Sequence, residues 1–141
     1  MSKISTILFK ETEPSHPDLP KVIAPSIGKA TSEKIQSVLG SYHAMGYHLI
    51  GGFSSNKLVA IIGLKIAGKH GDLNHIAVIE GYRNNGIGKQ IIRYASDFFS
   101  LQFLTAETDD EARGFYEKCG FSCQSFKGVY GIRYKCNYQR G

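Results

Sequence analysis

The sequence has no apolar run long enough to cross a membrane. The longest strongly apolar stretch, Leu58–Leu64, is far shorter than the roughly 20 residues that a membrane helix needs. Residues 1–6 also lack the apolar core of a signal peptide, and the chain shows no repeat or low-complexity tract. With 141 residues, 42% of them apolar, residues 1–141 are predicted to form one globular, cytoplasmic domain without a membrane partner.

Cysteine is also scarce, and its number is odd. Three cysteines do not make a disulfide framework for a domain of this size, so Cys119, Cys123 and Cys136 are predicted to be reduced thiols. A metal site is not expected. Cys119 and Cys123 span a predicted helix end and strand start, whereas His70 and His75 fall in a separate predicted hairpin.

Acidic residues are outnumbered by basic ones. There are 12 Asp and Glu against 17 Lys and Arg, which gives a formal net charge of +5. This surplus allows an anionic partner, whether nucleic acid, a membrane surface or a phosphate-bearing small molecule, and does not choose among them. Because the chain has neither a long basic run nor a basic stripe interleaved with aromatics, we expect no nucleic-acid partner.

Proline is missing after Pro25, so regular elements are free to form in the rest of the chain. Hydrophobic periodicity predicts strands over 4–9, 47–53, 57–66, 72–79, 102–106, 121–126 and 129–138, and helices over 14–24, from Thr31 or Ser32 to 42, over 87–99 and over 109–119, the last closed by Gly120. Hairpin-linked strands come first and strand–helix–strand crossovers follow. This order predicts one α/β domain with helices packed on a mixed sheet.

A loop rich in glycine and asparagine joins the fourth expected strand to the next helix. The first N–H groups of a helix have no internal partner and lie at the positive end of its dipole. Gly86 and Gly88 have no Cβ atoms, and Arg83 and Lys89 add two cations beside them. The loop is therefore predicted to hold a phosphate or pyrophosphate. It fits neither a P-loop, which needs glycine at Arg83, nor a dinucleotide motif, which needs glycine at Ile91.

Two motifs resemble the signatures of the GNAT superfamily of N-acetyltransferases. Arg83–Gly88 matches the acetyl-CoA signature (Gln or Arg, two residues, Gly, one residue, Gly or Ala) and follows the strand residues Ile76–Val78. Further on, Ala112–Phe121 is similar to the second signature, a helix ending in Phe-Tyr, three residues and Gly-Phe. The order of the predicted elements also resembles the family fold over nearly the whole chain.

The resemblance implies a fold and a co-substrate. The implied fold is a mixed, mostly antiparallel sheet of about seven strands with about four helices, splayed between strands four and five, with acetyl-CoA in the cleft. The backbone of the fourth strand would pair with the pantetheine arm, and the amides of the loop would hold the pyrophosphate. The implied cofactor-binding residues are Ile76, Ala77, Val78, Arg83, Asn84, Asn85, Gly86, Ile87, Gly88, Lys89, Asp109 and Tyr116.

Catalytic roles follow from the same resemblance. Tyr116 matches the position that protonates the departing CoA thiolate. Asp109 stands where many relatives have asparagine. It keeps the acceptor oxygen, loses the donor, and is expected to cap a helix. A carboxylate or histidine must take the proton of the amine. Glu80 and Glu107 are the first choices for this base, with Asp72 and His75 as alternatives.

The resemblance implies direct transfer of an acetyl group from acetyl-CoA to a primary amine of a small molecule. A protein or peptide N-acetyltransferase and a non-catalytic acyl-CoA-binding regulatory module are the alternatives. By analogy, His43, Tyr47 and His48 would line one wall of the acceptor site. The acidic side chains Glu11, Glu13, Glu80 and Glu107 would favour a cationic amine. The oligomeric state stays open, a homodimer included.

Overall fold

The first half of the chain forms an antiparallel meander. In the computed structural model, which describes residues 6–140, β1 (Leu8–Glu11), β2 (Tyr47–Ser54), β3 (Lys57–Ala67) and β4 (His70–Val78) pair in chain order. Three short elements lie between β1 and β2, namely α1 (Leu19–Ile23), the 3-10 helix η1 (Ala24–Ser26) and α2 (Ser32–Ser41).

The second half adds crossovers and a final hairpin. It contains α3 (Ile87–Phe98), β5 (Phe103–Thr108), α4 (Asp110–Lys118), β6 (Ser122–Gly128) and β7 (Gly131–Gln139). Within residues 6–140, seven strands lie in the order β1-β2-β3-β4-β5-β7-β6, and β4 and β5 are the parallel pair among antiparallel ones. Parallel neighbours need a long crossover connection, and α3 lies in that connection here.

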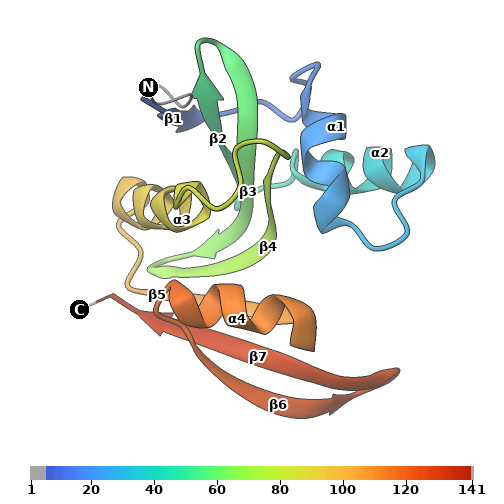
Figure 1. Cartoon of the computed structure of the whole chain (residues 1–141), viewed down its shortest axis with the longest axis vertical. Coiled ribbons are helices and arrows are strands. Elements are labelled where there is room, and N and C mark those ends of the chain that lie inside the picture. The colour runs from blue at the N-terminus through green and yellow to red at the C-terminus, as the bar shows by residue number, and fades with distance from the viewer. Residues whose placement is uncertain (1–5, 141) are drawn as a thin grey trace.

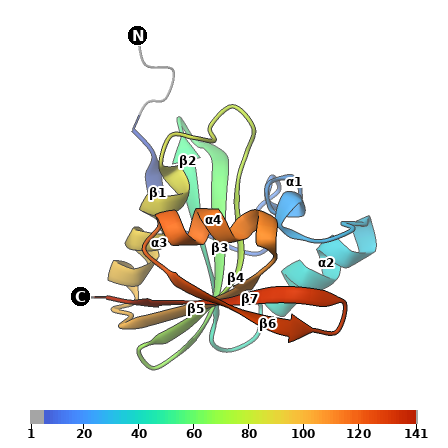
Figure 2. The same cartoon turned by 60° about the horizontal axis from the view of Figure 1, so that its bottom comes forward.

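Helices cover the sheet on both faces, with α1 and α2 on one side and α3 on the other (Figure 1). The core on the α1 and α2 side includes Leu39, Tyr42, Ile61 and Ala77. The opposite core is built on the apolar stripe of α3 and extends to Tyr116 and Phe121, so α4 covers the same face as α3. Figure 2 shows α4 above the β5–β7–β6 part of the sheet.

The predicted fold class is confirmed, with small changes at element ends. The Thr31 side chain caps α2 by accepting a hydrogen bond from the Lys34 N–H at 3.1 Å. Gly120 ends α4 with φ of +96°, a left-handed conformation that glycine adopts without steric cost. The first strand covers Leu8–Glu11, later than predicted, and Ile4 and Ser5 lie outside the described residues.

The prediction of three reduced thiols is wrong for two of them. Cys123 on β6 and Cys136 on β7 are directly opposite partners with Cα atoms 4.0 Å apart, and a disulfide joins them. The count of cysteines could not reveal this, because the pairing depends on the register of a hairpin. Cys119 is the free cysteine and is buried. Reduced cysteines therefore no longer support a cytoplasmic location.

Within residues 6–140, no helix is both long and apolar enough to span a membrane.

Candidate active site

The parallel pairing of β4 and β5 ends part-way along the strands. Pairing begins at His70 opposite Phe103 and stops at Asp72 opposite Thr105, although β4 continues to Val78 and β5 to Thr108. The register between β3 and β4 shifts after Gly63, which leaves Asn74 as an extra residue on β4. Such a bulge bends a strand. The two strands therefore diverge beyond Asp72, as predicted for the fourth and fifth strands.

The divergence leaves one edge of β4 without a partner strand. The Ile79 N–H donates to the Val59 carbonyl at 2.9 Å. Because antiparallel ladders alternate, the backbone groups of Ala77 face β3, and those of Ile76 and Val78 face the side where β5 has separated. The Val78 carbonyl accepts a hydrogen bond from Arg83 Nε at 2.7 Å, which agrees with this direction.

The loop after β4 is shaped by three left-handed residues. Gly81, Asn84 and Gly86 have φ of +93°, +64° and +77°. The Asn85 side-chain amide donates to the Arg83 carbonyl at 2.8 Å and so holds the turn closed. Gly86 is the N-cap residue of α3, and its carbonyl accepts the first helical bond, from Gln90.

The start of α3 presents free donors. Because the first helical bond comes from Gln90, the preceding N–H groups of the first turn have no intrahelical partner. The first turn carries no acidic residue, and Lys89 is exposed beside it. These donors and the dipole fit a pyrophosphate group.

The two glycines of the first signature have different roles. A Cβ atom at Gly86 would meet nothing within 4 Å, so its positive φ explains the glycine. A Cβ atom at Gly88 would lie 2.7 Å from Cε1 of Phe115. Gly88 is buried and lets α3 approach α4, so close packing of helices also explains this glycine.

Tyr116 lies on α4 and is only 6% exposed. Its ring contacts Phe115 and Phe121, with centroids 5.2 and 5.3 Å away. Burial, followed by the neighbouring Cys119 and Asp109, raises the pKa of Tyr116 to about 12. Tyr116 therefore keeps its proton at neutral pH, as a proton donor must. Asp109 caps α4 as predicted, since its Oδ1 accepts from the Ala112 N–H at 2.9 Å.

The candidate bases differ in their surroundings. Glu80 and Glu107 are exposed, and Glu107 lies opposite Lys135 of β7. Asp72 Oδ1 accepts a hydrogen bond from the Thr105 hydroxyl at 2.5 Å. His75 is half-buried, and burial lowers the pKa of its imidazole.

The structure adds a polar pair that the sequence did not reveal. The Tyr42 hydroxyl and His75 Nδ1 lie 2.6 Å apart, although 33 residues separate them. Tyr42 is 4% exposed, and burial raises the pKa of its hydroxyl well above the usual value. Gly63 stands directly opposite His75, and a Cβ atom there would overlap the Tyr42 ring. A glycine inside an otherwise apolar strand is the signal that could have indicated this close approach.

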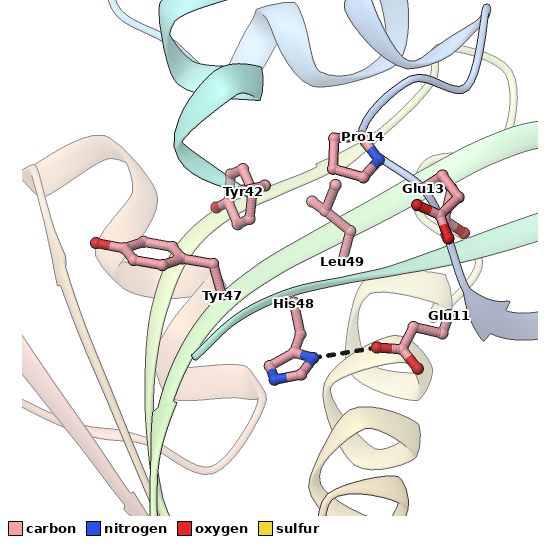
Figure 3. Close-up of a pocket in the computed structure, with 8 residues that line it drawn as sticks. Glu11, Glu13, Pro14, Tyr42, Tyr47, His48 and Leu49 are labelled. Carbon is pink, nitrogen blue, oxygen red and sulfur yellow. Dashed lines mark hydrogen bonds and ion pairs between the residues drawn. The ribbon is translucent and has the colours of Figure 1, made fainter. Parts of the chain in front are cut away.

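A hollow of about 220 Å³ is lined by Tyr42 but not by His75 (Figure 3). Tyr42 and Tyr47 stand at one end of it, and His48 Nδ1 pairs with Glu11 Oε2 at 3.1 Å at the other. A second hollow, of about 410 Å³, lies beside β1. Neither hollow is lined by residues of the loop between β4 and α3. The first gathers the predicted acceptor-wall residues Tyr47 and His48, but His43 is not among its lining residues.

The metal-ligating side chains do not cluster. Across residues 6–140, no three His, Cys, Asp or Glu side chains are grouped in a way that could hold a metal ion.

Comparisons with known proteins agree with this geometry. Residues 9–121 match the model of the acetyltransferase (GNAT) family. No curated protein matches the sequence. Many solved structures share the fold at low sequence identity, and three examples follow.

The first is the PaiA N-acetyltransferase from Thermoplasma acidophilum in complex with coenzyme A, with 17% identity and a TM-score of 0.73 over 96% of this chain and 100% of that one. The second is the aminoglycoside 6'-N-acetyltransferase from Enterococcus faecium, with 14% identity and a TM-score of 0.75 over 94% and 96%. The third is a GNAT acetyltransferase from Elizabethkingia anophelis with acetyl-CoA bound, with 16% identity and a TM-score of 0.74 over 95% and 98%.

Proposed function

The chain belongs to the acetyltransferase (GNAT) family, and on this basis we propose that it moves an acetyl group directly from acetyl-CoA to a primary amine of a small molecule. The observation that carries the proposal is the unpaired edge of β4, which runs into a loop with free helix N–H groups. Neighbours crystallised with coenzyme A or acetyl-CoA support the co-substrate. The aminoglycoside acetyltransferase neighbour supports a small-molecule amine as acceptor.

Acetyl-CoA supplies an activated acetyl group as a thioester. The N–H groups at the start of α3 would bind its pyrophosphate, and Lys89 and Arg83 would add positive charge nearby. The backbone of Ile76 and Val78 would pair with the pantetheine arm like an added strand. Arg83 already occupies the Val78 carbonyl, so the N–H of Val78 is the donor left for the co-substrate.

Two proton movements complete the reaction. The acceptor must lose a proton so that its nitrogen has a free lone pair, and Tyr116 would protonate the departing sulfur. A C–N bond forms and the C–S bond breaks. One proton of the ammonium is released to solvent through the base, and a second replaces the proton that Tyr116 gives. The amide of Val78 would stabilise the negative charge that develops on the carbonyl oxygen.

The test is release of free CoA from acetyl-CoA in the presence of single acceptors. The panel should contain an aminoglycoside, a polyamine, an alkyl amine, an amino acid and a peptide with a free N-terminus. We expect release above hydrolysis with at least one small amine and less with the peptide. Tight acetyl-CoA binding without release for any acceptor would instead indicate a binding module, and release with the peptide alone would indicate a protein acetyltransferase.

The Tyr116→Phe variant tests the assigned proton donor. General acids contribute about 100-fold or more to rate, so kcat should fall by roughly that factor. The dissociation constant for acetyl-CoA should stay within about twofold, because the ring is kept. An unchanged kcat would remove Tyr116 from the mechanism.

A further inference from the structure

The proposed function leaves the general base unassigned, and the Tyr42–His75 pair offers a candidate for it. Three of the four candidate bases have unfavourable surroundings. Glu80 and Glu107 are exposed, and neither carboxylate has a hydrogen-bond or ion-pair partner among residues 6–140 that would hold it in place. Asp72 accepts a hydrogen bond from Thr105 and lies 3.4 Å from His70 Nε2, so its carboxylate is engaged on the side away from the loop.

His75 immediately precedes Ile76, whose backbone faces the unpaired edge of β4. Its Nδ1 is held on the β3 side by Tyr42 at 2.6 Å. Its Nε2 has no hydrogen-bond partner among residues 6–140. One ring nitrogen is thus held by the protein and the other has no protein partner.

The environment of Tyr42 restricts its position. The ring lies over Gly63, where any side chain would overlap it, and its hydroxyl reaches the histidine directly opposite on β4. Tyr47 packs edge-on against the same ring with centroids 5.8 Å apart. Figure 3 shows Tyr42 and Tyr47 side by side where α2 ends and β2 begins. The tyrosine therefore has little freedom to leave the imidazole.

We propose that Tyr42 is a positioning residue that accepts a hydrogen bond from Nδ1–H of His75 and thereby leaves Nε2 to take the proton of the acceptor amine. This inference rests on the proposed function. In the step, an N–H bond of the ammonium breaks and an Nε2–H bond forms, so His75 becomes a cation while its Nδ1–H still donates to the Tyr42 oxygen. The proton then leaves to solvent. No oxidant or further reactant is needed.

His75 shares its face of the sheet with several charged and titratable groups. Burial is the cause that lowers the pKa of His75, so the neutral, proton-accepting form is present at pH 7. The other titratable groups on this face of the sheet include Tyr42 from α2, Tyr47 from β2, Lys65 from β3, His70 and Asp72 from β4, Glu107 from β5 and Lys135 from β7.

The first experiment does not need turnover. Nitrogen NMR of the imidazole side chains should show His75 in the Nδ1–H tautomer in the wild type. In Tyr42→Phe, which keeps the ring over Gly63, we expect a mixture of both tautomers and a lower pKa, because the cation loses its acceptor. Tyr94→Phe is the matched control. Tyr94 is a half-buried tyrosine of α3 packed against Phe9 and Phe98, and its loss should leave His75 unchanged.

The second experiment uses any amine that the CoA-release assay identifies. His75→Asn keeps a donor for Tyr42 but removes Nε2, so kcat should fall about 100-fold with acetyl-CoA affinity unchanged. Tyr42→Phe should lower kcat about 10-fold and move the acidic limb of the kcat/KM profile to lower pH. Tyr94→Phe should do neither.

The outcomes separate this inference from the proposed function. Absence of turnover with every amine would refute the function, and the NMR result would still decide the pairing. An Nε2–H tautomer in the wild type, full activity in His75→Asn, or a Tyr42→Phe profile with an unmoved limb would each overturn the role given to the pair. If Tyr42 had only a structural role, Tyr42→Phe would lower the melting temperature but leave the tautomer of His75 and the acidic limb of the pH profile unchanged.

Discussion

Gly63→Ala is expected to be costly for a one-carbon change. The added methyl group would overlap the hydroxyl and ring of Tyr42, which is 4% exposed and packed between Tyr47 and His75. Either β3 must shift or the tyrosine must leave its position. If the tyrosine moves, the hydrogen bond to His75 is lost with it.

The magnitude follows from these two losses. Overpacking of a well-filled core costs about 1–3 kcal/mol, and a hydrogen bond contributes about 1 kcal/mol. We therefore expect the free energy of unfolding to fall by about 2–4 kcal/mol. For a chain of 141 residues the unfolding entropy is on the order of 0.3 kcal/mol/K, so the melting temperature should fall by about 7–13 °C.

Thermal and urea unfolding of Gly63→Ala, with Gly40→Ala as control, would test this estimate. Gly40 lies on the exposed side of α2, and a Cβ atom there meets nothing within 4 Å. Alanine at that helix position should stabilise the protein by about 0.5–1 kcal/mol. In a Tyr42→Ala background, which makes room, Gly63→Ala should cost less than about 1 kcal/mol. A Gly63→Ala melting temperature within about 2 °C of the wild type would refute the close packing of Tyr42 on β3.

Three further predictions concern other parts of the molecule. Gly86→Val should weaken acetyl-CoA binding more than Gly86→Asn in calorimetric titrations, because asparagine adopts the left-handed conformation at φ of +77° more readily; equal affinities would contradict it. The free energy of unfolding should fall as pH drops below about 6.5, since unfolded His75 binds a proton that folded His75, with its lowered pKa, resists; this part of the pH dependence should be missing in His75→Asn. Thiol labelling of the denatured, unreduced chain should modify Cys119 alone, and labelling of Cys123 or Cys136 before reduction would contradict the disulfide.

The order of helices and strands could be predicted from the sequence because each element carries its own periodicity. The apolar stripe of α3 and the almost continuous apolar run of β3 are examples, since one helix face and a strand buried on both sides leave different patterns. The shape of the loop at Gly86 was also predictable, because its left-handed residues are glycines and an asparagine that lie close together in the chain.

Contacts between distant segments were not predictable in this way. The disulfide depends on the register that sets Cys123 opposite Cys136, and no count of cysteines contains that register. The Tyr42–His75 pair depends on how the end of α2 lies over β3, and Gly88 is partly explained by Phe115, which lies 27 residues away in sequence. In each case the sequence shows the residues and the tertiary fold decides their partners.

The proposed function requires that the divergence of β4 and β5 exposes a backbone edge that binds acetyl-CoA. Amide hydrogen exchange with and without acetyl-CoA tests it residue by residue. We predict that the N–H of Val78 and the N–H groups at the start of α3 gain protection, whereas Ala77, already bonded to β3, changes little. Protection that leaves both Val78 and the first turn of α3 unchanged, with acetyl-CoA bound, would contradict the claim.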